Sequence, residues 1–103
     1  MGQVISVNYE DVGGGNDIVF ERQVEITTAK TYHTKNAYFT CGTSDSGTTY
    51  GIGELVDGVL TQRKNISNDY TMTYDAITEI LSVKHNGTYA SYKYMSIMYE
   101  DLG

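Results

Sequence analysis

The chain has 103 residues, a net charge of −6 and no proline or tryptophan. A domain of this size can bury a core without metals or disulfides, and the lone Cys41 excludes an intrachain disulfide. The seven Lys and Arg residues are scattered singly, so the basic stripe that binds phosphates is absent. No apolar stretch approaches the ~20 residues of a membrane-spanning helix, and no signal-peptide pattern occurs. We therefore expect no nucleic-acid partner and no membrane partner.

Amino-acid usage favours strands over helices. Tyr, Thr and Val recur along the chain, and no window shows the apolar spacing of an amphipathic helix. Short apolar stretches instead alternate with Gly, Asn and Asp turns roughly every 8–12 residues, as in all-β domains. We predict a single all-β domain over residues 1–103, an antiparallel β-sandwich or a jelly-roll-like small barrel of about seven or eight strands.

The N-terminal part predicts two strands. Residues 3–9 predict the first, followed by a glycine-rich loop at 13–17. The longest stretch of alternating apolar and polar residues, from Ile18 to Thr28, predicts a strand with one solvent-exposed face. Its apolar side consists of Ile18, Phe20, Val24 and Ile26, interrupted by Arg22, which we interpret as a rim residue. The polar residues 29–35 are expected to form a connection.

The middle of the chain predicts a strand and a hairpin. Residues 36–41 predict a strand, in which Cys41 is interpreted as a small buried hydrophobe. Asp57-Gly58 is a strong signal for a two-residue turn, because both central positions of a type I′ turn need positive φ. We expect a strand over 49–56 and a hairpin that joins it to 59–64.

Two further turn signals set the register of the final third. If Asp75-Ala76 and Asn86-Gly87 are two-residue loops, residues 69–99 form a three-stranded antiparallel meander. Tyr74 then faces Ile77. Both turns place one set of side chains on a shared apolar face: Tyr70, Met72, Tyr74, Ile77, Leu81, Val83, Ala90, Tyr92 and Tyr94.

The last strand is apolar on both faces. Tyr94 and Met98 point one way, whereas Met95, Ile97 and Tyr99 point the other. Such a strand is either central in a sheet or covered by another subunit. We favour a subunit interface formed by Tyr94, Met95, Ile97 and Tyr99.

Glu79 and Tyr89 are further candidate binding residues. Glu79 falls on the apolar face between Met72 and Tyr94, where a carboxylate needs a partner. It is either a rim residue that accepts a tyrosine hydroxyl or a polar anchor in an aromatic groove. Tyr89 falls on the opposite face and is expected to be exposed, where its ring suits protein and sugar contacts.

No pattern of catalytic or metal-binding residues stands out. His33 and His85 have no partners at ligand spacing, and His85 is interpreted as a surface residue beside the Asn-Gly turn. Gly42 and Gly47 have the spacing of a phosphate loop, but Thr48 stands where its lysine belongs. We predict no catalytic residue, no metal and no cofactor.

Two segments that lie far apart in the sequence are similar to each other. Ser6–Gly13 and Ser96–Gly103 share Ser, Tyr, Glu, Asp and Gly at equivalent positions. The echo is either chance in a tyrosine-rich β chain or a sign of assembly, with equivalent strands in equivalent slots.

The segment from Tyr70 to Gly87 resembles the Tyr-Asp, Leu-x-Val, Asn-Gly hairpin of lectin-like sandwiches. Together with the Thr, Ser, Tyr and Gly content, it also resembles β modules of phage tail fibres, baseplates and capsid decorations. The phage resemblance implies a non-enzymatic structural module that forms a homo-oligomer and contacts other virion proteins. The lectin resemblance implies a domain that binds cell-surface glycans or a receptor, although this chain lacks the tryptophan usual there.

Overall fold

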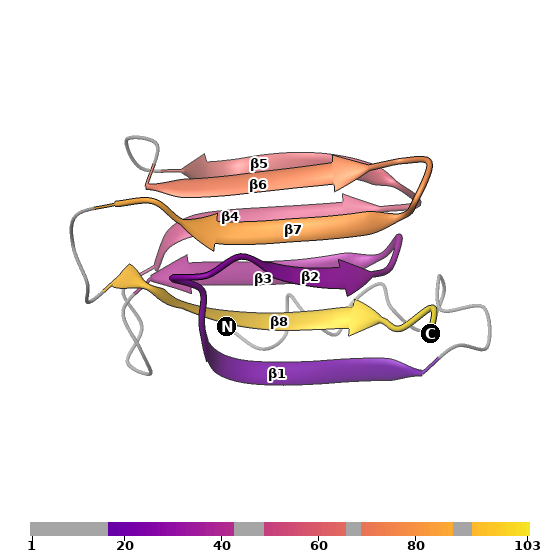
Figure 1. Cartoon of the computed structure of the whole chain (residues 1–103), viewed down its shortest axis with the longest axis horizontal. Helices are drawn as coiled ribbons and strands as arrows, with labels where there is room; N and C mark the ends of the chain where they lie inside the picture. The colour runs from indigo at the N-terminus through magenta and orange to yellow at the C-terminus, as the bar shows by residue number, and fades with distance from the viewer. Residues whose placement is uncertain (1–16, 43–48, 66–68, 88–91) are drawn as a thin grey trace.

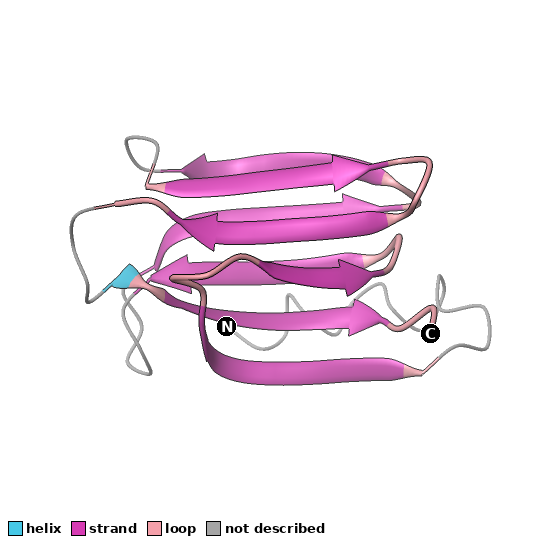
Figure 2. Ribbon diagram, in the orientation of Figure 1, coloured by secondary structure: helices cyan, strands magenta, loops and turns pink. Residues whose placement is uncertain are grey.

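The computed structural model describes residues 17–42, 49–65, 69–87 and 92–103. These residues form strands in two antiparallel sheets (Figures 1 and 2), which confirms the predicted all-β sandwich. The strands are β1 (Ile18–Glu25), β2 (Lys30–His33), β3 (Ala37–Gly42), β4 (Thr49–Val56), β5 (Val59–Asn65), β6 (Tyr70–Asp75), β7 (Ile80–His85) and β8 (Tyr94–Glu100). One sheet has the order β1-β8-β3-β4-β5 and the other has the order β2-β7-β6.

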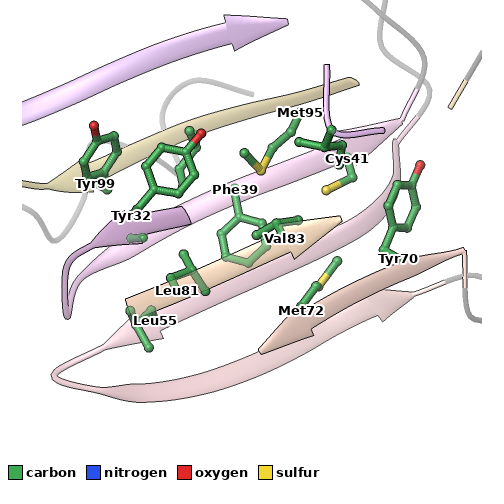
Figure 3. Close-up of a cluster of buried hydrophobic side chains, with 13 residues drawn as sticks. Tyr32, Phe39, Cys41, Leu55, Tyr70, Met72, Leu81, Val83, Met95 and Tyr99 are labelled. Atoms are coloured by element: carbon green, nitrogen blue, oxygen red, sulfur yellow. The ribbon is translucent and has the colours of Figure 1, made fainter. Parts of the chain in front are cut away.

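The core fills the space between the two sheets. Alternate side chains of each strand point inward, as the two-residue period of a strand requires. Figure 3 shows Phe39, Leu81 and Val83 together in this layer, and all three are fully buried. Cys41 is buried there as well, which confirms its prediction as a small core residue.

The Asp57-Gly58 turn is confirmed. Val56 pairs with Val59, so Asp57 and Gly58 alone connect β4 to β5. Their φ angles are 50° and 80°, the left-handed values that a type I′ turn requires.

Replacing Gly58 by alanine should cost about 1 kcal/mol of unfolding free energy, because Cβ disfavours the left-handed region. A Cβ there would meet its nearest neighbour, Tyr74 Cε2, at 3.8 Å, an ordinary contact, so the cost comes from the backbone. Urea denaturation measures it, and Gly58→Asn is the control because Asn tolerates this conformation. An unchanged midpoint in the alanine variant would contradict the turn assignment.

A β-bulge in β1 overturns the predicted apolar side of that strand. The pairing with β8 shifts between Glu21 and Val24, and Gln23 has a φ of 54°. The extra residue reverses which side chains face the core. Val19 therefore packs against the core before the bulge and Val24 packs against it afterwards, while Ile18 and Phe20 are exposed. Glu21, which was predicted to point into solvent, accepts a hydrogen bond from the Tyr32 hydroxyl at 2.9 Å.

The structure confirms which side chains of β6 and β7 face the core, but the predicted pairing register of this hairpin is wrong. Residues 76–79 form the turn, and Tyr74 pairs with Leu81 instead of Ile77. Each β6 residue thus meets a β7 residue four positions beyond the expected one. An even shift keeps every side chain on its face, so Leu81 and Val83 are buried as predicted. Ile77 lies in the turn and is exposed instead.

The predicted three-stranded meander is wrong. Asn86-Gly87 does not join two paired strands, because β7 pairs with β2 and β6 whereas β8 belongs to the other sheet. The chain crosses between the sheets here, and Asn86 N donates to Asp69 O at 2.6 Å. β7 lies between β6 and β2 in its sheet. β2 falls within residues 29–35, which were expected to form a connection.

Candidate interaction surface

The five-stranded sheet has a second face, turned away from the three-stranded sheet, which we call the outer face. The pairing register places one row of side chains across it: Phe20, Met98, Tyr38, Glu54 and Thr61. Ile18 belongs to the same face on β1, and Val56 and Val59 belong to it at the β4–β5 turn. No strand that the structure describes lies over this face.

Exposed apolar side chains lie at two margins of the outer face, on the edge strand β1 and at the β4–β5 turn. In the described part of the chain, the large hydrophobic side chains that are clearly exposed include Ile18 (40%), Phe20 (48%), Val56 (44%) and Val59 (66%), all on this face. Ile77, at 92%, lies elsewhere, in the β6–β7 turn. Exposed apolar residues are ordinary when scattered singly. Their location on one sheet face points to an interaction surface.

One ion pair on the outer face joins Glu54 and Arg63. Arg63 donates to Glu54 Oε1 through Nε at 2.9 Å and through Nη2 at 2.7 Å. The Tyr38 ring lies between this pair and Met98 in the register and is itself buried. Burial raises the pKa of the Tyr38 hydroxyl, with a smaller rise from Glu54 and an opposing effect of Arg63. The hydroxyl therefore stays neutral at physiological pH.

Two buried polar side chains, Asn36 and Glu100, form a hydrogen-bonded pair at one end of the outer face. Asn36 Nδ2 donates to Glu100 Oε1 at 2.8 Å, and Asn36 Oδ1 accepts from Asp57 N at 2.8 Å. Both Asn36 and Glu100 are almost completely buried. Because buried carboxylates need hydrogen-bond donors, Asn36 ties β8 to the β4–β5 turn and removes one carboxylate from the surface.

The predicted interface strand is central in its sheet. β8 lies between β1 and β3, and Met95, Ile97 and Tyr99 point into the core, where they are buried without a second subunit. Of the two alternatives for a doubly apolar strand, the central one accounts for these three residues. Tyr94 points the other way, to the outer face beside Glu25, and is half-buried.

Glu79 does not face an apolar groove. It lies in the β6–β7 turn with a φ of 59°, and its Oε1 lies 3.7 Å from His33 Nε2. The turn forms because Asp75 Oδ1 accepts from Ile77 N and Thr78 N, which holds the pKa of Asp75 below its usual range. Tyr89 lies outside the described residues, as does the segment 6–13 of the sequence echo.

A tyrosine cluster lies at one end of the five-stranded sheet, at the start of β4 and just before β8. The rings of Tyr50 and Tyr92 stack with centroids 4.0 Å apart. The Tyr70 hydroxyl donates to Tyr92 O at 2.6 Å. The predicted meander placed Tyr92 on the same apolar face as Leu81, whereas Tyr92 lies just before β8, which belongs to the other sheet from β7.

The described residues hold no cluster of three or more His, Cys, Asp or Glu side chains that could bind a metal. Burial raises the pKa of the Cys41 thiol to about 12, which keeps it protonated and unreactive. In the same part of the chain, we find no helix with the length and apolar character needed to cross a bilayer.

Comparisons with known proteins found no match: no protein-family model, no curated protein and no solved structure resembles this chain.

Proposed function

We propose that the chain is a non-enzymatic structural module that assembles with further copies of itself through the outer face. The location of Ile18, Phe20, Val56 and Val59 on one sheet face carries this proposal. The Thr-, Ser-, Tyr- and Gly-rich composition fits a phage virion or tail as the setting. Sheets pack face to face by interdigitating such side chains, as the two sheets of this sandwich do.

The charges on the outer face are compatible with a second copy as the partner. A chain with a net charge of −6 repels its own copies at long range. Association therefore needs a face of low charge, and on the outer face Glu54 is paired with Arg63 while Glu100 is buried. A two-fold contact would bring the same patch of both copies together.

Paired substitutions test the proposal. Phe20→Thr removes an exposed outer-face ring while keeping a good strand former. We expect its dissociation constant for self-association to rise about tenfold, the equivalent of 1.4 kcal/mol. Ile77→Thr removes an even more exposed apolar side chain from the β6–β7 turn, and its dissociation constant should not change. Sedimentation velocity measures both. If the two variants behave alike, the outer face is not the contact.

A glycan- or receptor-binding module is the second candidate, and the stacked Tyr50–Tyr92 pair favours it. Tyrosine rings offer flat apolar surfaces on which sugars stack. This function predicts a monomer whose thermal midpoint rises with a bound sugar, whereas the assembly module predicts an oligomer whose midpoint depends on protein concentration.

A further inference from the structure

Three backbone hydrogen bonds join the connections at one end of the sandwich. The chain leaves the five-stranded sheet after β1 to form β2, and it crosses back to that sheet between β7 and β8. Between these points, Ile26 N donates to Lys93 O and Ile26 O accepts from His85 N, both at 2.8 Å. Asn86 N donates to Asp69 O beside them. Because Ile26 is fully buried, this junction is part of the core and not a surface loop.

The His85 side chain is buried in this junction without a hydrogen bond at Nε2. Only 7% of His85 and 8% of Asp69 are exposed, against the expectation of a surface histidine. Within the described part of the chain, Nε2 of His85 has no hydrogen-bond partner. A Cβ on Gly87 would lie 2.5 Å from Asp69 Oδ1 and 3.0 Å from His85 Nε2, so the missing side chain of Gly87 leaves the space that both groups occupy.

The groups around the imidazole favour its neutral form. Burial lowers the pKa of His85, and the ammonium of Lys93, just before β8, adds to this effect. Asp69, just before β6, opposes it. Lys93 is itself near Glu25, at 3.8 Å, and the neutral Tyr70 ring lies 5.4 Å from the imidazole. A protonated ring would present a buried N–H without an acceptor, which is costly.

We propose that His85, Asp69 and Gly87 form an acid-sensitive lock that holds the two sheets together at this end while His85 is neutral and loosens when it takes up a proton. Because Nε2 of His85 has no hydrogen-bond partner among the described residues, proton uptake places an unpaired charge in the core and weakens the contacts around Ile26.

The direction of the pH dependence follows from this arrangement. The unfolded chain binds a proton on His85 near pH 6.5, and the folded chain binds it at lower pH. Stability is therefore full above the unfolded pKa and is lost as the pH falls toward the folded pKa. One proton limits the loss to a tenfold fall in the folding equilibrium constant per pH unit.

Histidine NMR on the unmodified chain tests the lock without any variant. The Cε1–H resonance of His85 should titrate with a midpoint below 6.5, and Asp69→Asn should lower that midpoint further. Protection factors for amide exchange at Ile26 and His85 should fall between pH 7 and pH 5 beyond the change at Phe39 in β3. A midpoint above 6.5 would mean that Asp69 and His85 form an ion pair, and would overturn the proposal.

Urea denaturation of matched histidine variants provides the second readout. Between pH 7.5 and pH 5, the folding equilibrium constant should fall in the unmodified chain and stay level in His85→Gln. His33→Gln is the control, because His33 contacts Glu79 and Gly103 O outside the junction, and it should keep the slope of the unmodified chain. If His33→Gln removes the slope and His85→Gln keeps it, the lock does not exist.

Discussion

Replacing Gly53 by alanine is expected to lower the unfolding free energy by about 3 kcal/mol, the upper range for overpacking a core. Gly53 of β4 pairs with Phe39 of β3, and the phenyl ring lies across the glycine. A Cβ at Gly53 would lie 2.1 Å from Phe39 Cζ and 2.5 Å from Cε2. Because Phe39 is fully buried between the sheets, the ring has no free space into which to move.

Two comparisons make the Gly53 prediction specific. Gly51→Ala should cost only about 1 kcal/mol, since its nearest neighbours are the flexible Met72 Cε and the Tyr70 ring, both at 3.0 Å. Phe39→Leu combined with Gly53→Ala should lose at least about 1.5 kcal/mol less than the sum of the single changes. Urea denaturation measures all of them. Additive losses would mean that the ring does not cause the effect.

Replacing Asn36 by alanine should cost about 3 kcal/mol, because two hydrogen bonds are lost from buried groups. The variant deprives the buried Glu100 carboxylate of the Asn36 amide donor, and it deprives Asp57 N of its acceptor. The loss should appear as a lower urea midpoint at neutral pH. Asn86→Ala is the matched control, because the exposed Asn86 side chain donates to the exposed Thr71 hydroxyl, and it should cost less than about 0.5 kcal/mol.

Asn36→Asp tests the same pair through pH. The variant keeps an acceptor for Asp57 N but places a second carboxylate against Glu100. Like charges raise the folded-state pKa of such a pair, so the missing stability should partly return as the pH falls and protonates it. A variant that is equally unstable at pH 7 and pH 5 would contradict the assigned contact.

Strand faces were predictable where alternation and local turns agree. The β4–β5 hairpin follows from Asp57-Gly58, whose φ requirement only a few residues meet. The inward faces of β6 and β7 follow from alternation even though the pairing of Tyr74 was misjudged, because an even shift leaves the faces intact. Alternation along β8 correctly separates Tyr94 from Met95.

The remaining features depend on long-range contacts that leave little local signal. Asn86-Gly87 has the composition of a hairpin turn, but a bond from Asn86 N to Asp69 O holds it at a crossing between sheets. The β1 bulge reverses the face of Phe20, and its sequence signal was Arg22, the charged residue that interrupts the apolar alternation. The outer face could not be foreseen because its exposure depends on which strands share a sheet.

We propose that this domain acts by associating with its own copies. Multi-angle light scattering across a dilution series of the unmodified chain tests it most directly. We expect a mass that is a multiple of 11.4 kDa at high concentration and that falls on dilution or in Phe20→Thr. A mass of 11.4 kDa at every concentration would contradict it.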